Sequence, residues 1–336
     1  MDGFPHLLAA EAQSFPALPG WLGGIAPSMQ QTLKTAIDCV GTGLHSGRPV
    51  HLTLHPAPAG HGIVFLRSDL GRRIPARFDA VVDTRLCTVI ADPADRQVSV
   101  GTVEHLMAAL AGLGVDNVLV SIDAAELPVF DGSAEPFVFL IERAGIVAQD
   151  APRRVIAIEE MVRVQDGAAF AELHPADTDA PLDYAPMGIA PGLAMAMSID
   201  FPAPAIGRQS LALTLSPEAF RAELARARTF TMAGDIDALR TTGLALGGSL
   251  DNAVVVDGGR VLNPGGLRME REFVRHKLLD AVGDLALAGA AIHGRFVSHR
   301  GGHALNNRLL RALFARPGAW RDLVSGLAQP AASLAA

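Results

Sequence analysis

Two segments far apart in the chain place the same elements in the same order, and this repeat restricts the possible folds more than any other feature. Residues 104–122 and residues 275–296 each have a histidine early in an apolar helix, then a glycine, then a strand rich in β-branched residues. Such a recurrence within one chain indicates a duplicated α+β unit. We therefore expect an α+β fold of two similar domains, with a site at their junction.

The length of the chain also favours two domains. At 336 residues, 49% of them hydrophobic, the chain is longer than a single hydrophobic core usually serves. The string APRR at 151–154 separates the two halves. We expect a loosely ordered N-terminal extension at 1–30, a first α+β domain at 31–152, a second at 153–320 and a C-terminal tail at 321–336.

Alternating apolar residues and turn signals predict the elements of each half. In the first half we expect strands at 32–41, 50–57, 62–69, 85–92 and 116–124, and helices at 102–114 and 133–145, the second capped by Ser133 and ended by Gly145. In the second half we expect strands at 155–164, 168–176, 194–200, 209–215, 253–259, 259–263 and 290–299, and helices at 216–227 and 272–287.

Charge and cysteine content exclude several classes of protein. The net charge is −7 and no basic run is longer than a pair, so nucleic acid is not an expected partner. The only cysteines, Cys39 and Cys87, exclude a disulfide scaffold and a Cys-rich zinc site, and favour a reducing compartment. No basic leader opens the chain and no apolar run reaches about 18 residues, so we expect no secretory signal, no transmembrane segment and a cytoplasmic protein.

The helix at 272–287 carries polar residues along one edge. His276, Asp280 and Asp284 follow one another at four-residue steps, so their side chains share one face. A solvated face would have the same pattern. However, two histidines and one aspartate are a sound ligand set for a catalytic zinc ion, because they leave one coordination position open. His276 and Asp280 could form this set with His105 of the other domain.

Two further residues could supply acid–base chemistry beside these ligands. Glu104 is adjacent to His105 and could take a proton from a water molecule activated by the metal. His303 follows two glycines, whose flexible backbone allows close approach to a ligand, and Asp284 is placed to hold such a histidine in its charged form. His-x-x-x-Asp and Glu-His patterns also occur by chance, so the spacing alone does not decide whether these residues bind a metal.

A larger set of strings around these residues resembles one protein family. The strings are GTGLHSGRPVHLTLHPAPA (41–59), TVEHLMAALAGLGVDN (102–117), DGSAEPFV (131–138), RARTF (226–230), LGGSLDNAVV (246–255), EFVRHKLLDAVGDL (272–285) and GGHALNN (301–307). They resemble the UDP-3-O-acyl-N-acetylglucosamine deacetylases, the zinc amidases of the committed step of lipid A biosynthesis in Gram-negative bacteria. The resemblance spans about residues 31 to 315.

The resemblance implies a fold, a reaction and a set of reacting groups. The fold would be two domains, each a β-sheet layered against helices in a β-α-α-β sandwich, with the active site at their junction. The enzyme would be a hydrolase that removes the N-acetyl group from UDP-3-O-acyl-N-acetylglucosamine, giving UDP-3-O-acyl-glucosamine and acetate. Carried over position by position, the resemblance implies zinc ligands at His105, His276 and Asp280, a general base at Glu104, and a cationic partner of the leaving amine at His303, with Asp284 oriented toward it.

The resemblance also implies where substrate is held. Thr229 and Lys277 would stabilise the oxyanion and bind the substrate, and Phe230 would contact the sugar ring. Residues 241–256 match the part of the family that lines an apolar passage for the acyl chain, although tight strand packing also explains small side chains there. The substrate-binding residues are then expected to be Phe230, Leu86, Cys87, Ala245, Gly248, Ser249, Leu250 and Ala253.

Several alternatives stay open from the sequence. A non-catalytic nucleotide-sugar or glycolipid binding protein with a structural metal site could have the same fold, and Fe²⁺ accepts a His2Asp ligand set as well as Zn²⁺ does. The extension at 1–30 and an enlarged loop at 177–194 have no counterpart in the family pattern. The uncharged apolar tail at 328–336 could be a protease-accessible end, which would make a protease a partner.

Overall fold

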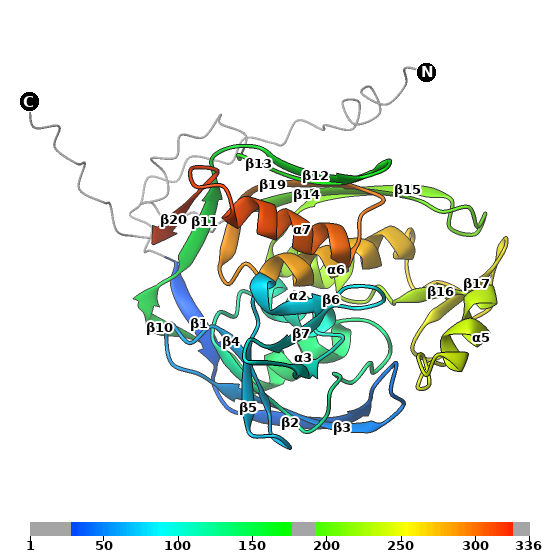
Figure 1. Cartoon of the computed structure of the whole chain (residues 1–336), viewed down its shortest axis with the longest axis horizontal. Coiled ribbons are helices and arrows are strands. Elements are labelled where there is room, and N and C mark those ends of the chain that lie inside the picture. Colours follow the sequence, from blue (N-terminus) through cyan, green and yellow to red (C-terminus); the bar gives the residue numbers. More distant parts are fainter. Residues whose placement is uncertain (1–27, 177–191, 325–336) are drawn as a thin grey trace, which may run out of the picture.

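The computed structural model describes residues 28–176 and 192–324 of the chain. Most of the expected extension at 1–30, most of the loop at 177–194 and the tail from residue 325 onward lie outside the described residues. The described chain has helices between two larger β-sheets, together with several smaller sheets (Figure 1). Its described helices include none that is both long and apolar enough to cross a membrane.

The first sheet has five strands in the order β2-β3-β9-β4-β5. In β3, the buried residues Val50, Leu52 and Leu54 alternate with the outward His51 and His55, as expected for a sheet with one face on the core. The strands are β2 (Ile37–Thr42), β3 (Pro49–Pro56), β4 (Ile63–Arg67), β5 (Arg72–Pro75) and β9 (Val118–Ile122).

The second sheet has the same plan around strand β19. Strand β19 pairs antiparallel with β13 and parallel with β14, and both neighbours belong to hairpins, with β12 and β15 respectively. Buried and less buried residues alternate along all of β14 and β19, so one face of this sheet covers the core. These strands are β12 (Val162–Asp166), β13 (Ala169–His174), β14 (Leu193–Asp200), β15 (Arg208–Thr214) and β19 (Ala291–His299). Two more, β11 (Arg154–Ile158) and β20 (Trp320–Val324), complete this seven-stranded sheet, with β11 parallel to β19.

The two units repeat one another element by element. Each central strand, β9 or β19, follows one helix and precedes another, and lies antiparallel to one hairpin and parallel to a second. A terminal pair, β1 (Met29–Leu33) with β10 (Ile146–Pro152), also recurs as β11 (Arg154–Ile158) with β20 (Trp320–Val324). The duplicated α+β fold is therefore confirmed. The helices are α2 (Glu104–Gly112), α3 (Glu135–Ala144), α6 (Glu272–Ala286) and α7 (His303–Phe314).

Each unit carries an insert at the equivalent place, between its second hairpin and its first helix. Each insert contains a small three-stranded sheet, β6-β7-β8 in the first unit and β16-β17-β18 in the second. The first insert contains η1 (Phe78–Ala80), β6 (Val81–Asp83), β7 (Val89–Asp92) and β8 (Asp95–Val100). The second contains α4 (Pro217–Ala219), the π-helix η3 (Phe220–Leu224), β16 (Phe230–Met232), α5 (Ala233–Thr241), β17 (Val254–Asp257) and β18 (Arg260–Val261).

Several predicted elements differ from the structure. The single strand expected at 32–41 is two strands, because residues up to Leu33 pair with β10 whereas those from Ile37 pair with β3. The strand expected at 155–164 divides for the same reason between β11 and β12. The helix expected at 216–227 has only one α-helical turn before it widens into η3, where the Phe220 ring fills the space beside Gly112.

Ser133 is not the N-cap of α3, contrary to the sequence-based expectation. The cap is Ala134, and the Ser133 hydroxyl instead bonds to Asp131 while accepting a bond from the backbone of Glu135. Ser133 therefore orders the turn before the helix. Gly145 does end α3, with φ of 75°. The sequence also gave no indication of α5 or α7.

Candidate metal and catalytic site

The packing of α2 against α6 brings the three expected ligands together. Nε2 of His105 lies 3.6 Å from Oδ1 of Asp280, and Nε2 of His276 lies 3.3 Å from the same oxygen. All three side chains are buried, and one ligand atom from each lies within 4.8 Å of the others. The helical spacing expected from the sequence thus places His276 and Asp280 on the face that meets the other unit.

The hydrogen bonds of this cluster leave its inward atoms available to a cation. Nδ1 of His276 bonds to the carbonyl of Ala227 at 3.0 Å, which assigns the proton to Nδ1 and leaves the Nε2 lone pair facing Asp280. Burial lowers the pKa of His276 to about 4, so its imidazole is neutral, as a metal ligand must be. Oδ1 of Asp280 is buried without a hydrogen-bond partner. A buried carboxylate oxygen between two imidazoles fits a divalent metal ion.

Lys277 occupies the other oxygen of Asp280. Its Nζ donates to Oδ2 at 3.0 Å, and the side chain is largely buried. Burial alone would raise the pKa of Asp280, but His276 and Lys277 outweigh it and hold that pKa well below its usual range. Asp280 is therefore an anion in this site.

Glu104 begins α2 and lies beside the ligands without occupying their position. Its Oε2 accepts a hydrogen bond from the backbone N–H of Thr88 at 3.0 Å, and its Oε1 lies 4.0 Å from Nε2 of His303. Burial raises the pKa of Glu104, which moves this carboxylate toward the range of a useful general base. Glu104 and His303 are therefore close enough to act on the same reacting group.

His303 begins α7 and is held by Asp284 of α6. Nδ1 of His303 lies 2.9 Å from Oδ2 of Asp284, and the amide of Asn306 donates to the same oxygen at 2.8 Å. Burial disfavours the charged imidazole, but the charge and hydrogen bond of Asp284, together with Glu104, raise the pKa of His303 to about 9. His303 is therefore a cation near neutral pH, with Nε2 directed at the cluster.

Left-handed backbone residues lie at the entry of both ligand-bearing helices. Thr102 has φ of 57° two residues before Glu104, and Arg271, the N-cap of α6, has φ of 54°. Such conformations are costly for residues other than glycine and are concentrated at functional sites. Both lie in the turns that lead into α2 and α6.

Thr229 and Phe230 lie at the edge of the cluster. Phe230 packs edge-on to His276 with ring centroids 6.3 Å apart, and against Phe273 at 5.0 Å. The N–H of Thr229 donates to Gly132 at 2.8 Å, and its carbonyl accepts from Val254 at 2.7 Å. Thr229 is thus fixed by one backbone bond to the first unit and one within its own unit.

The other expected substrate residues lie in two groups. Leu86 is 46% exposed, whereas Cys87 is buried next to Thr88, and burial raises the pKa of its thiol to about 12. The thiol is therefore protonated and unreactive.

The second group lies on a segment of the second insert that rests on the first unit. The N–H of Leu246 donates to His45 at 3.1 Å, and that of Gly247 to Leu44 at 3.0 Å. The segment is joined to Thr229 through strand β17, and the bonds and ring contacts of the described residues do not link it directly to the His–Asp cluster. It contains the expected residues Ala245, Gly248, Ser249, Leu250 and Ala253.

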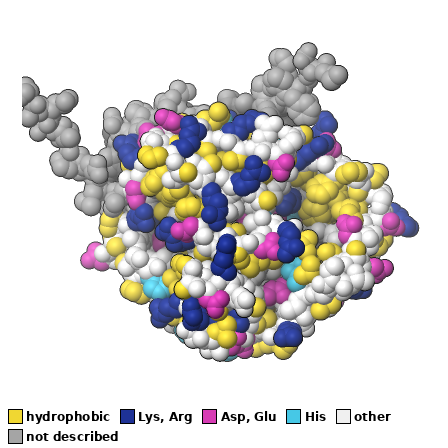
Figure 2. Space-filling view, viewed as in Figure 1, with side chains coloured by type: hydrophobic (Ala, Val, Ile, Leu, Met, Phe, Trp, Pro, Cys, Tyr) yellow, Lys and Arg dark blue, Asp and Glu magenta, His cyan; other side chains and the backbone are white. Residues whose placement is uncertain are grey.

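Exposed apolar side chains gather on this insert. Leu246, Leu250, Leu262 and Leu267 are each at least 36% exposed. Figure 2 shows hydrophobic side chains on the right-hand side of the view, where Figure 1 places β15 to β17. The insert therefore offers apolar surface beside the polar cluster.

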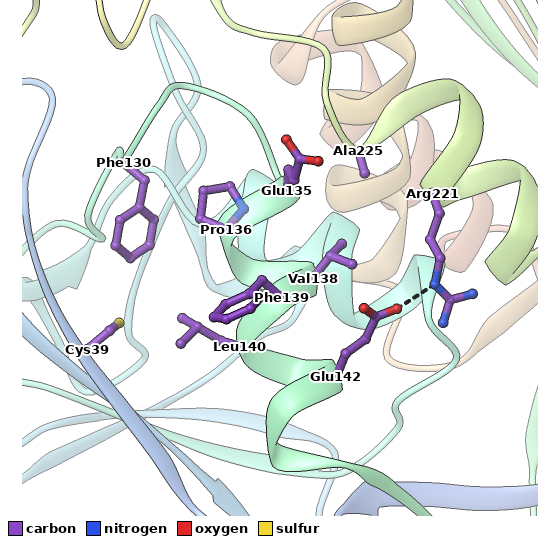
Figure 3. A pocket seen from close by; sticks show the side chains of 10 residues that line it. All are labelled: Cys39, Phe130, Glu135, Pro136, Val138, Phe139, Leu140, Glu142, Arg221 and Ala225. Carbon is purple, nitrogen blue, oxygen red and sulfur yellow. Dashed lines mark hydrogen bonds and ion pairs between the residues drawn. The ribbon is translucent and has the colours of Figure 1, made fainter.

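Two hollows in the surface lie away from the His–Asp cluster. One, of about 620 Å³, lies over α3 and includes Phe130, Phe139 and Arg221, which pairs with Glu142 (Figure 3). The other, of about 640 Å³, lies between the units at the C-terminal ends of α2 and α6. Neither contains an expected site residue. The chemistry of the ligand set, and not the size of a hollow, identifies the site.

Three residues of the site were not foreseen from the sequence: Thr88, Asn306 and Gly283. Thr88 and Asn306 bond to the reacting carboxylates, and Gly283 allows α2 and α6 to approach. Asn306 stands in the GGHALNN string, and Gly283 stands on the helix between the two aspartates. Thr88 carried no signal beyond its place after Cys87.

Two histidines and an aspartate, with a carboxylate and a cationic histidine beside them, define the class of metal-dependent hydrolases. Residues 30–315 match the family model described as LpxC, UDP-3-O-acyl N-acetylglycosamine deacetylase. The chain is 48% identical over 300 residues to the UDP-3-O-acyl-N-acetylglucosamine deacetylase of Shewanella sp. (strain W3-18-1), covering 88% of this chain and 92% of that relative. It is 47% identical over 310 residues to that of Idiomarina loihiensis, covering 91% and 96%. The chain belongs to this deacetylase family.

Proposed function

We propose that the protein is a metal-dependent hydrolase that removes the N-acetyl group from UDP-3-O-acyl-N-acetylglucosamine, with release of acetate, in lipid A biosynthesis. Membership of the deacetylase family supports the reaction. The observation that carries the proposal for this chain is the unpartnered Oδ1 of Asp280 between the imidazoles of His105 and His276. These three residues would hold the metal.

A bound zinc ion would polarise the acetamide carbonyl and lower the pKa of water. Glu104 takes a proton from the attacking water, for which its buried, hydrogen-bonded carboxylate is suited. His303 gives its Nε2 proton to the leaving nitrogen, because Asp284 keeps it charged until that point. The two groups therefore act as base and acid on one substrate held between them.

Substrate is held by residues around this pair. Thr229 and Lys277 stabilise the oxyanion and bind the substrate, and Phe230 lies against the sugar ring beside His276. Leu86 and Cys87 lie in the first insert, between β6 and β7, and residues 245–253 offer the apolar surface of the second insert to the acyl chain. These assignments would be tested by KM changes with substrates of different acyl length.

The proposal is tested by measuring acetate release from UDP-3-O-acyl-N-acetylglucosamine before chelation, after chelation and after adding back an equivalent of zinc. We expect activity to disappear and then return. Bound metal without turnover would instead favour the non-catalytic nucleotide-sugar binding protein. That alternative leaves the approach of Glu104 to His303 unexplained.

The resident metal, the compartment and a protease partner form part of the same proposal. Both Zn²⁺ and Fe²⁺ accept a His2Asp ligand set, so add-back with each ion under anaerobic conditions decides between them. The free thiols of Cys39 and Cys87 fit a cytoplasmic protein. A protease acting on the tail predicts that deletion of residues 328–336 lengthens the lifetime of the protein in cells.

A further inference from the structure

Thr88 connects the two carboxylates on either side of the reacting pair. Its backbone N–H donates to Oε2 of Glu104 at 3.0 Å, and its hydroxyl donates to Oδ1 of Asp284 at 2.6 Å. Thr88 is 1% exposed, so neither bond competes with bulk water. A single residue of the first unit therefore holds one carboxylate from each ligand-bearing helix.

The backbone of Thr88 is itself fixed. It lies immediately before β7, and its carbonyl accepts a hydrogen bond from Val103, which caps α2, at 3.3 Å. The N–H that holds Glu104 is therefore part of the framework of the first unit. Only the hydroxyl can be removed by substitution without altering the backbone.

The hydroxyl bond determines how Asp284 presents itself to His303. Oδ1 of Asp284 accepts from Thr88, while Oδ2 is shared by His303 at 2.9 Å and Asn306 at 2.8 Å. Hydrogen bonds to both oxygens restrict the rotation of the carboxylate about its Cβ–Cγ bond. Thr88 and Asn306 thus hold Asp284 from opposite sides with Oδ2 facing the imidazole.

We propose that Thr88 is a positioning residue for the hydrolytic reaction, which orients Glu104 through its backbone and His303, by way of Asp284, through its hydroxyl. The inference rests on the proposed function. Thr88 would set the distance between the base Glu104 and the acid His303 without itself touching the substrate or a metal ligand. The two roles are separable, because a change of side chain affects only the arm that leads to His303.

The test compares Thr88→Val with Thr88→Ser. Valine keeps the shape of the side chain and the backbone bond to Glu104 but leaves Oδ1 of Asp284 unpaired. A hydrogen bond to a buried charge contributes about 1.5–3 kcal/mol, so its loss corresponds to a fall of about 10- to 100-fold in kcat. We expect KM and bound zinc to stay within about twofold and Thr88→Ser to recover most of the activity. Thr214→Val, at an exposed position of β15, is the matched control.

A double-mutant cycle tests the route through Asp284. Thr88→Val should cost little in an Asp284→Asn background, because the carboxylate on which the hydroxyl acts is already altered. Additive losses would overturn the proposal, as would an unchanged kcat in Thr88→Val. If Thr88→Val folds poorly, equal losses in Thr88→Ser, which keeps the hydroxyl, would also overturn it.

A crystal structure of Thr88→Val separates this inference from the proposed function. We expect the Asp284 carboxylate to rotate and its distance to His303 to increase, while the Glu104 contact to the residue 88 backbone persists. An unrotated Asp284 contradicts the inference even if the wild-type protein is a deacetylase. A rotated Asp284 supports it even if the wild-type protein releases no acetate, an outcome that overturns only the proposed function.

Discussion

Gly283 of α6 lies against Glu104 of α2 so closely that a Cβ atom at Gly283 would stand 2.0 Å from the Glu104 carbonyl oxygen. No real side chain fits at that distance from backbone atoms. The same helix carries Asp280 and Asp284 on either side of Gly283, and α2 carries His105 next to Glu104. The separation of the two helices, and therefore the size of the ligand set, depends on a glycine at this position.

Gly283→Ala should disturb this helix crossing. The added methyl group forces α2 and α6 apart, so we expect a loss of about 1–3 kcal/mol in the free energy of unfolding, measured by denaturant titration. A displacement of about 1 Å in the reacting groups should lower kcat by about 100-fold and weaken zinc binding.

Gly234→Ala in α5 is the control for that variant, since a Cβ there meets nothing within 4 Å. It should leave zinc affinity unchanged and stability unchanged or slightly raised. Equal effects of the two substitutions would refute the assigned role of the helix crossing.

Arg228 and Glu272 form a buried ion pair at 2.8 Å, directly beside Thr229. Arg228→Met leaves Glu272 buried without its cation, so we expect a loss of about 3–5 kcal/mol in the free energy of unfolding. The surface pair of Arg226 with Glu135 provides a comparison, and Arg226→Met should cost about 0–1 kcal/mol. If denaturant titrations show similar losses of unfolding free energy for both variants, the buried pair contributes no more to stability than the surface pair.

The pH dependence of kcat should show the states of Glu104 and His303. Glu104 must be deprotonated and its pKa is raised by burial, so activity should fall on the acidic side. His303 must be protonated and its pKa is about 9, so activity should fall as the pH rises through about 9.

Asp284→Asn tests the cause of the alkaline limb. It removes the negative charge that raises the pKa of His303, so the alkaline limb should move to lower pH. The acidic limb should move less, because Asp284 is a minor cause of the raised pKa of Glu104. Profiles of kcat from about pH 5 to about pH 10 would show this directly. If the alkaline limb does not move in Asp284→Asn, a group other than His303 causes it.

The sequence predicted which of the three helix side chains cluster with His105 better than it predicted the bounds of the surrounding strands. Helical periodicity placed His276, Asp280 and Asp284 on one face, and the repeat indicated which helix supplies His105, because both features depend on local spacing. The strand breaks near residues 34–36 and 159–161 could not be predicted, since they reflect which neighbour each segment pairs with.

The supporting residues of the site depend on contacts between distant segments. Thr88 and Asp284 are bonded across 196 positions of sequence, and no local pattern predicts such a pair. Gly283 resembles an ordinary helix glycine until the neighbouring helix is known. His303 was expected on flexible backbone but begins α7, a helix whose apolar face is defined by its packing on the second unit.

The most direct test measures bound zinc and acetate release on the same preparations of the wild-type protein, Glu104→Gln and Asp280→Ala. We expect Glu104→Gln to keep about one zinc per chain while kcat falls by about 100- to 10,000-fold, because only the base is lost. We expect Asp280→Ala to lose zinc and activity together, with the fold intact by circular dichroism. Substantial acetate release by either variant would contradict the assignment of this buried cluster as a metal-dependent hydrolytic site.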